Sequence, residues 1–340
     1  MRVLMLTPYL WAPRGNSTTV RRISCALQRQ GLEVQVVTME EADWPRAVQA
    51  ALAERPPALV HGFHAGHMGT ALEVVPELGQ YPWVVTATGT DLSLQLGGEG
   101  SARVRRALEV ARAVVVFSRE HLRLLAEGVP RLATPVTVIP QGVELEPGPP
   151  LRREDAGLQP GQVVWVWAGG LRPVKRLELA LEGMAPVART RPGLRLLVLG
   201  GVLDAEYAAR LIRRMEQLPW VVYAGEIPHC EVASWLGLAD AVLNTSASEG
   251  QPQAALEAMS LGKPAVMTAV VGNLGVMEPG REGFYVHDAQ ELAAAVERLS
   301  ADPVLRRQMG ERARRLVAGR FSVAAETAGY LRVYREVAGG

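Results

Sequence analysis

Short apolar runs alternate with amphipathic segments along most of this chain. The β-branched runs predict strands, and segments with helical periodicity follow many of them. The runs are too uniformly apolar for a sheet with one exposed face, so they predict a parallel sheet covered on both faces. In the first half the predicted strands are 2–6, 34–38, 58–61, 83–87, 113–117 and 136–139, and the predicted helices lie near 16–30, 44–54, 102–112 and 119–127.

A Pro- and Gly-rich stretch interrupts this alternation, which then starts again. We therefore expect an N-terminal Rossmann-like domain over 1–145, a linker over 146–160 and a C-terminal Rossmann-like domain over 161–320. The last helix, 321–340, is expected to pack back toward the first domain. The second half predicts strands at 162–168, 195–199, 220–224, 240–244 and 265–269, and helices near 176–189, 204–217, 229–237, 252–261, 289–300, 303–318 and 322–337. We expect two doubly wound α/β domains facing each other across a cleft, with ligands at the carboxyl ends of the strands.

The composition narrows the class of protein. With 340 residues and 48% hydrophobic content, the chain can bury two cores. A net charge of +1 without an aromatic-rich basic patch gives no reason to expect nucleic acid. No apolar run approaches the ~20 residues of a membrane span, and the first residues indicate a strand rather than a signal peptide. We therefore expect a cytoplasmic protein without a membrane partner, in which Cys25 and Cys230 are buried free thiols.

Lysine is rare in this chain, which draws attention to position 175. Only Lys175 and Lys263 are lysines among the 36 basic residues. Lys175 follows a predicted strand and the Gly169-Gly170 turn, together with Arg172 and Arg176. Cationic side chains at this height can clamp a diphosphate. The alternative is a solvated basic helix start.

Two glutamates follow another predicted strand. Glu249 and Glu257 stand eight residues apart, with Pro252 expected at the first position of the helix between them. At about 1.5 Å per residue, Glu257 lies roughly 7 Å along the helix axis. One carboxylate on each side of a phosphate-sized site suits a nucleotide-sugar, which has hydroxyls on both sides of its diphosphate. The alternative is a pair of surface residues.

The expected helix start also offers backbone amides. After the Gly250 turn, the amides of Gln251, Gln253 and Ala254 are expected to face outward from the positive end of the helix. Such an end is suited to an anion.

The first half contributes polar candidates after its strands. Gly15 allows close backbone approach, and Asn16 or Ser17 can cap a helix or contact a ligand. Further along the chain, Asp91 can accept a substrate hydroxyl or cap the next helix, and a structural role is favoured. The acceptor-side candidates are His64, Thr88, Gly89, Thr90 and Asp91.

Other chemistries find less support. His61, His64 and His67 are spaced three apart, but no second-shell carboxylates accompany them, so we expect no metal site. No G-x-G-x-x-G follows the first strand, which argues against a dinucleotide oxidoreductase. No Ser-His-Asp or Cys-His arrangement supports a hydrolase.

Three motifs together resemble a known family. Gly169-Gly-Leu-Arg-Pro-Val-Lys, Ser248-Glu-Gly-x-Pro with Glu257, and Leu261-Gly-Lys-Pro-Ala-Val are similar to the retaining nucleotide-sugar glycosyltransferases of family 4, which have the GT-B fold. The resemblance covers essentially the whole chain. Gly15-Asn16, Thr88-Gly-Thr-Asp and Gly272-Asn273 are closest to the branch with glycosyltransferase-1-domain-containing proteins and selenosugar synthases.

The resemblance implies a role for each matching position. Lys175, helped by Arg172, neutralises the diphosphate; Glu249 holds the donor sugar and Glu257 the ribose. Further donor contacts are implied for Gly15, Asn16, Gly170, Ile227, Gly250, Gln251, Pro252 and Gln253. No metal or other cofactor is implied, because cationic side chains and a helix end do the electrostatic work of a divalent ion.

Two positions depart from the family pattern. Gly170 stands where the family usually has arginine, and we infer that Arg172 substitutes for it. Thr88 stands where the family commonly has a histidine that touches the donor sugar.

The sequence therefore predicts a metal-independent, retaining hexosyltransferase. Its donor is expected to be a UDP-sugar and its acceptor a small molecule. A nucleotide-sugar epimerase of similar fold and a catalytically silent nucleotide-sugar-binding protein are the alternatives. Acceptor and oligomeric state stay open.

Overall fold

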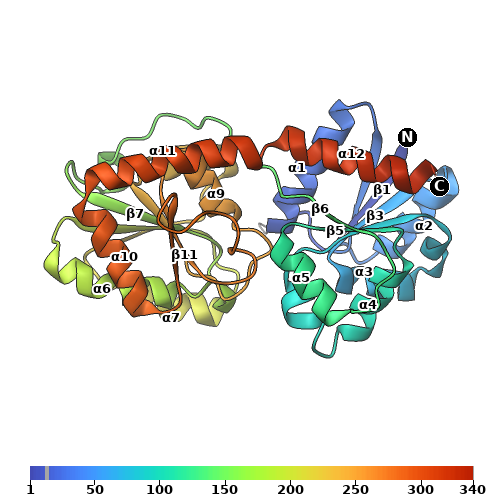
Figure 1. Cartoon of the computed structure of the whole chain (residues 1–340), viewed down its shortest axis with the longest axis horizontal. Helices are drawn as coiled ribbons and strands as arrows, with labels where there is room; N and C mark the ends of the chain where they lie inside the picture. Colours follow the sequence, from blue (N-terminus) through green and yellow to red (C-terminus); the bar gives the residue numbers. More distant parts are fainter. Residues whose placement is uncertain (12–14, 340) are drawn as a thin grey trace. The chain divides into compact units, whose positions relative to one another are not determined.

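The chain folds into two compact units. The computed structural model describes residues 1–11 and 15–339, except for the side chains of residues 15, 16 and 94. One unit comprises Met1–Gly142 with the chain from Phe321 onward, and the other comprises Val143–Arg320 (Figure 1). We refer to them as the N-terminal and C-terminal units.

The N-terminal unit is built on a six-stranded parallel sheet in the order β2-β1-β3-β4-β5-β6. Its central strands are buried along their whole length, as expected for a sheet covered on both faces. The strands are β1 (Arg2–Thr7), β2 (Glu33–Thr38), β3 (Leu59–Phe63), β4 (Trp83–Thr86), β5 (Ala113–Val116) and β6 (Val136–Val138). The helices are α1 (Gly15–Arg29), α2 (Trp44–Glu54), α3 (Ala65–Val74), α4 (Ser101–Val110), α5 (Arg119–Gly128) and α12 (Val323–Gly339), with short turns η1 (Pro76–Gln80) and η2 (Asp91–Gln95).

The C-terminal unit repeats the architecture, with a six-stranded parallel sheet in the order β12-β11-β10-β7-β8-β9. The strands are β7 (Val163–Ala168), β8 (Leu194–Leu199), β9 (Val221–Gly225), β10 (Ala241–Asn244), β11 (Ala265–Thr268) and β12 (Gly283–Val286). The helices are α6 (Leu177–Thr190), α7 (Ala205–Glu216), α8 (Val232–Gly237), α9 (Gln253–Ser260), α10 (Ala289–Ala301) and α11 (Pro303–Arg320), with turns η3 (Glu154–Ala156), η4 (Pro173–Lys175) and η5 (His229–Glu231). The predicted α/β class with parallel sheets is confirmed.

Two elements were not predicted, and glycines explain both. Helix α3 is buried nearly all round, so it lacks an amphipathic stripe; a Cβ at its Gly69 would lie 2.3 Å from the carbonyl oxygen of Arg103 in α4. Strand β12 begins at Gly283, where a Cβ would lie 1.8 Å from the carbonyl oxygen of Ala265 in β11. Glycine weakens both patterns in the sequence because it is there to permit close approach.

Helix α12 belongs to the N-terminal unit and packs against α1, which crosses it (Figure 1). Arg22 of α1 donates two hydrogen bonds of 2.9 Å to Glu326 of α12, and both side chains are buried. Beneath the same helix, the His61 ring contacts the hydroxyls of Tyr334 at 2.6 Å and Thr86 at 2.7 Å. The last helix is therefore joined to the sheet through buried polar groups as well as apolar contacts.

Cys25 and Cys230 are exposed, so the expectation of buried thiols was wrong: Cys25 lies on an outward face of α1, and Cys230 lies in η5. Within the described residues, no helix combines the length and apolar character needed to cross a membrane.

The buried His61 makes the stability of the N-terminal unit sensitive to acid. Burial lowers the pKa of His61 from 6.5 to about 3, so the folded ring stays neutral while the unfolded ring takes up a proton. The free energy of unfolding should therefore fall as the pH drops from 6.5 toward 3, by up to about 1.4 kcal/mol per pH unit. Urea unfolding of wild type and His61→Gln across this range measures the effect, with hydrogen exchange of β3 amides identifying the transition of this unit.

Between pH 6.5 and 3, the free energy of unfolding of His61→Gln should fall less steeply than that of wild type, by the contribution of one proton. Equal slopes for the two proteins would show that His61 does not carry this acid sensitivity.

Candidate functional site

The parallel sheet of the C-terminal unit places the carboxyl ends of its strands along one edge. Gly169 and Gly170 follow β7, Ser246 lies beyond β10, Ala269 follows β11 and Ile227 lies beyond β9. Because β10 and β7 are neighbours in the sheet, the segments that follow them lie side by side. Segments distant in the sequence therefore meet at this edge.

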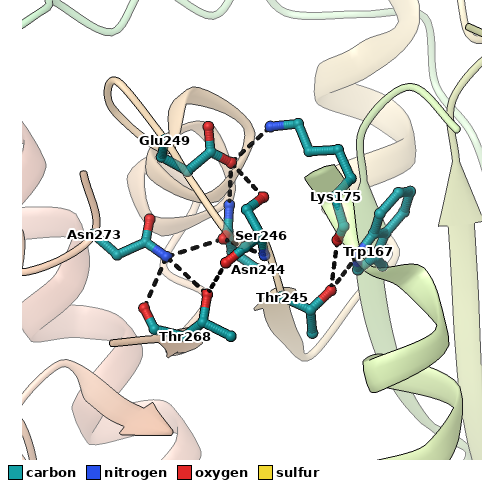
Figure 2. A network of polar contacts seen from close by, with 8 residues as sticks. All are labelled: Trp167, Lys175, Asn244, Thr245, Ser246, Glu249, Thr268 and Asn273. Carbon is teal, nitrogen blue, oxygen red and sulfur yellow. Dashed lines mark hydrogen bonds and ion pairs between the residues drawn. The ribbon is translucent and has the colours of Figure 1, made fainter. Parts of the chain in front are cut away.

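One oxygen of Glu249 is the meeting point of these segments. Glu249 Oε1 accepts hydrogen bonds from Lys175 Nζ at 2.6 Å, Ser246 Oγ at 2.6 Å and Asn244 Nδ2 at 3.0 Å (Figure 2). The side chain of Glu249 is 9% exposed and that of Lys175 is 19% exposed. The structure thus brings together two predicted residues and adds two that sequence reasoning missed, Asn244 and Ser246.

These contacts keep the Glu249 carboxylate ionised. Burial alone raises the pKa of this carboxyl, but the charge of Lys175 and the hydrogen bonds from Lys175, Ser246 and Asn244 outweigh it, so the pKa is lowered. At neutral pH the group is therefore a hydrogen-bond acceptor rather than an acid.

The backbone around Lys175 is held in an uncommon conformation. Arg176, the next residue, has φ 48° and ψ 48°, in the left-handed region. The Lys175 carbonyl accepts a hydrogen bond from Thr245 Oγ1 at 3.0 Å, and Thr245 Oγ1 accepts one from Trp167 Nε1 at 2.9 Å. A left-handed non-glycine residue costs about 1–3 kcal/mol and is concentrated at functional sites. Here it turns the chain directly after the lysine.

The start of α9 differs from the predicted one. Pro252 has φ −78° and ψ 71°, so it precedes the helix, which begins at Gln253. The expectation that Pro252 is the first helical residue was wrong because its ψ is not helical. The amide of Gln253 donates to the carbonyl of Gln251 at 2.9 Å, so it does not face outward as predicted. The backbone amides at this helix start that lack an intrahelical acceptor are therefore those of Ala254 and Ala255.

The remaining predicted residues of this half lie along the same edge. Glu257 is half-buried in the second turn of α9, and Ile227 is half-buried beyond β9. Gly250 and Gln251 lie between Glu249 and α9. Glu249 and Glu257 therefore flank the start of α9, as the motif spacing predicts.

Gly170 and Arg172, the positions that concern the family arginine, lie just before η4. Arg172 is half-buried with an extended backbone and occupies the N-cap position of η4, where its side chain makes no capping hydrogen bond. A Cβ at Gly170 would lie 2.3 Å from Cδ1 of Leu203. A larger residue at position 170 therefore requires the flexible Leu203 side chain to move.

The acceptor-side candidates of the N-terminal unit are also clustered. The Asp91 carboxylate accepts hydrogen bonds from the amides of Ala65 at 2.8 Å and Gly89 at 2.8 Å, and also from those of Thr88 and Leu92. It thereby ties the loop after β4 to the start of α3, in agreement with the structural role favoured from the sequence.

His64 lies next to this loop in a strained conformation. It has φ 71° and its Nε2 lies 3.3 Å from Thr90 Oγ1. Donor contacts are also predicted for Gly15 and Asn16, the first residues of α1, but these contacts lie outside what the structure describes, which is only the backbone of the two residues.

Among the residues that the structure describes, no group of three or more His, Cys, Asp or Glu side chains could hold a metal ion. Both ring nitrogens of His61 contact hydroxyl groups, while His64 and His67 have ring centroids 4.6 Å apart. The three histidines therefore do not share one site.

Part of the chain matches a known protein family. Residues 162–302 match the family described as glycosyl transferases group 1. The chain is 27% identical to glycosyltransferase 1 domain-containing protein 1 of Xenopus tropicalis over 95% of this chain and 94% of that protein. It is 33% identical to a D-inositol 3-phosphate glycosyltransferase of Segniliparus rotundus, over 59% of this chain but only 46% of that longer protein.

Solved structures share the fold over nearly the whole chain. Sucrose-phosphate synthase from Thermosynechococcus elongatus superposes with a TM-score of 0.83 and 22% identity, covering 99% of both chains. HepE of Anabaena in complex with UDP-glucose superposes with a TM-score of 0.80 and 19% identity, covering 99% of this chain and 100% of that one.

The fold is thus the two-sheet α/β architecture of GT-B glycosyltransferase structures. Residues 162–302, which match the glycosyl transferases group 1 family, include Lys175, Glu249 and Glu257.

Removing the charge of Lys175 should raise the pKa of Glu249. In Lys175→Met the burial that disfavours the carboxylate remains, while the opposing charge and one hydrogen bond are lost. Carbon-13 NMR titration of glutamate-labelled protein measures this pKa, with Glu249→Gln assigning the resonance. The matched control is Lys263→Met, because Lys263 contacts the carbonyl of Gly237 instead. An unchanged pKa in Lys175→Met would contradict the proposed balance of burial and charge.

Proposed function

We propose that this protein is a retaining glycosyltransferase that moves a hexose from a UDP-sugar to a small acceptor. The observation that carries the proposal is the contact between Lys175 and Glu249 beside the start of α9, with Glu257 one turn further on. The names of the relatives support transfer of a sugar, and the Anabaena structures hold UDP and UDP-glucose. Membership of family 4 is part of the same proposal.

Lys175 binds the diphosphate in this scheme. Its ammonium group has three N–H donors, and one of them is directed to Glu249. The other two can therefore bind phosphate oxygens without breaking the ion pair. Arg172 and the amides of Ala254 and Ala255 add positive charge, so the diphosphate needs no divalent cation to leave.

Glu249 holds the hexose. Three donors converge on Oε1, which leaves Oε2 as the oxygen that accepts a hydrogen bond from a donor-sugar hydroxyl. Glu257 accepts hydrogen bonds from the ribose hydroxyls on the other side of the diphosphate. The two carboxylates thereby fix the two sugars on either side of the bond that breaks.

The reaction itself uses no protein nucleophile. The bond between the anomeric carbon and the diphosphate oxygen breaks, and the acceptor hydroxyl attacks the same face of the hexose. The acceptor's proton passes to the departing diphosphate, so the configuration of the anomeric carbon is retained. The protein contributes charge stabilisation and positioning.

Incubation with UDP-glucose or UDP-N-acetylglucosamine tests the function without knowledge of the acceptor. We expect slow release of UDP by transfer to water, with the α anomer of the sugar formed first and the rate unchanged by EDTA. Formation of an epimeric nucleotide-sugar would identify an epimerase. Binding without turnover, even with a broad panel of acceptors, would identify a silent binding protein, and either result would overturn the proposal.

Loss of Lys175 should impair turnover much more than loss of the other lysine. Removing one charge-stabilising donor typically lowers kcat by about 10²–10³-fold, so we expect this loss in Lys175→Ala. Lys263→Ala, which removes a lysine of the same unit bonded to Gly237, should retain activity within about twofold. Rates of UDP release from the two variants provide the measurement, and a fully active Lys175→Ala would exclude the role given to this residue.

Moving the charge tests whether Arg172 takes the place of the family arginine that is absent at Gly170. Arg172→Ala should lower turnover, and adding Gly170→Arg should restore part of it, because Leu203 can move aside for the new side chain. Gly170→Met in the same background adds similar bulk without charge and should restore nothing. Full turnover by Arg172→Ala alone would show that Arg172 does not take this part.

A further inference from the structure

The loop that follows β11 packs directly against Glu249. A Cβ at Gly272 would lie 2.1 Å from the carbonyl oxygen of Glu249 and 2.6 Å from its Cβ. Such distances exclude any side chain at position 272 without displacement of the Glu249 backbone. The loop therefore packs in direct contact with the main chain of Glu249.

The same loop reaches the carboxylate through two asparagines. Asn273 Nδ2 donates to Asn244 Oδ1 at 3.0 Å, and Asn244 Nδ2 donates to Glu249 Oε1 at 3.0 Å (Figure 2). Because Asn244 Oδ1 is engaged by Asn273, the amide of Asn244 must present its NH₂ group to Glu249. Asn273 thus sets the orientation of a side chain that contacts the carboxylate, together with the backbone amide of Ser246, which donates to Asn244 Oδ1 at 3.3 Å.

Asn273 is itself fixed from below. Its Nδ2 also donates to the carbonyl of Thr268 at 2.9 Å and lies 3.3 Å from Thr268 Oγ1. Thr268 Oγ1 donates its one hydrogen to the carbonyl of Ser246 at 2.6 Å, so it can only accept from Asn273. The direction of each hydrogen bond is therefore determined from Thr268 to Glu249.

This arrangement leaves one polar atom unsatisfied. Asn273 is fully buried, and its Oδ1 has no hydrogen-bond partner among the described residues. A buried acceptor without a partner lowers stability, and an apolar residue of similar shape avoids that loss. The side-chain amide of Asn273 is therefore better explained by the hydrogen bonds that its Nδ2 donates than by a contribution to the stability of the fold.

We propose that Asn273 and Asn244 are positioning residues for the transfer reaction. Asn273 acts through Asn244, and together they hold Glu249 with Oε1 occupied and Oε2 directed at the donor hexose. The inference rests on the proposed function, because it gives Glu249 a sugar hydroxyl to bind. It adds that the loop after β11 determines how well the hexose is held, while the UDP part depends on other residues.

Asn273→Leu tests the relay with a side chain of similar shape and no donors. We expect turnover of UDP-glucose to fall by about 10- to 100-fold, as misplacement of a positioning group does. The dissociation constant for UDP should change by less than about threefold, since UDP lacks the hexose. Asn244 is half-buried, so Asn244→Ala is less liable to disturb folding. This variant should likewise lower turnover of UDP-glucose while leaving the dissociation constant for UDP nearly unchanged.

Ser300→Ala is the matched control for a general loss of stability. Ser300 Oγ accepts a hydrogen bond from Trp165 Nε1 at 3.1 Å in the core of the same unit, away from Glu249. Its loss should lower thermal stability while leaving UDP binding and UDP-glucose turnover unchanged. The relay would be overturned if the asparagine variants lost UDP binding as strongly as UDP-glucose turnover, or if their turnover stayed within twofold of wild type.

A second readout separates this inference from the proposed function. The hydrogen bond from Asn244 lowers the pKa of Glu249, so both asparagine variants should raise that pKa in a carbon-13 NMR titration. This measurement needs no substrate. Wild-type protein that binds no UDP-sugar would refute the proposed function, whereas an unchanged Glu249 pKa in both variants would refute the relay.

Discussion

The charge on the Glu249 carboxylate is the constraint on which this site depends. Burial opposes that charge, and the ammonium group of Lys175 with two neutral donors outweighs the opposition. The donors come from two stretches of chain, one after β7 and one from the end of β10 into the loop after it. They meet because parallel strands that are neighbours in a sheet release their following loops at the same edge. The topology thus supplies what no single segment could.

Close packing at this edge requires backbone that ordinary residues rarely provide. Gly272 lets one loop touch the main chain of Glu249, and Arg176 turns through the left-handed region directly after Lys175. Asn273 Oδ1 is buried and finds no hydrogen-bond partner in the part of the chain that the structure describes, while Nδ2 of the same amide donates. Each of these features tends to lower stability locally, and such features are concentrated at functional sites.

The sequence was sufficient for the parts of this protein that are locally encoded. Alternating apolar runs predicted both parallel sheets, and the spacing of Glu249 and Glu257 with the rare Lys175 predicted residues that lie along one edge. Helix α3 and strand β12 were missed because their glycines serve contacts with distant segments. Asn244 and Asn273 were missed as a pair because their partnership exists only across neighbouring strands. Gly272-Asn273 was noted as part of a family resemblance, yet nothing nearby in the sequence indicates what it touches.

The most direct test is a crystal structure of the protein with UDP-glucose bound. We expect the diphosphate within hydrogen-bond distance of Lys175 Nζ, a hexose hydroxyl on Glu249 Oε2 and the ribose on Glu257. Glu249 Oε1 should still accept hydrogen bonds from Asn244 and Ser246. A diphosphate bound elsewhere, or a hexose that does not contact Glu249, would contradict this expectation.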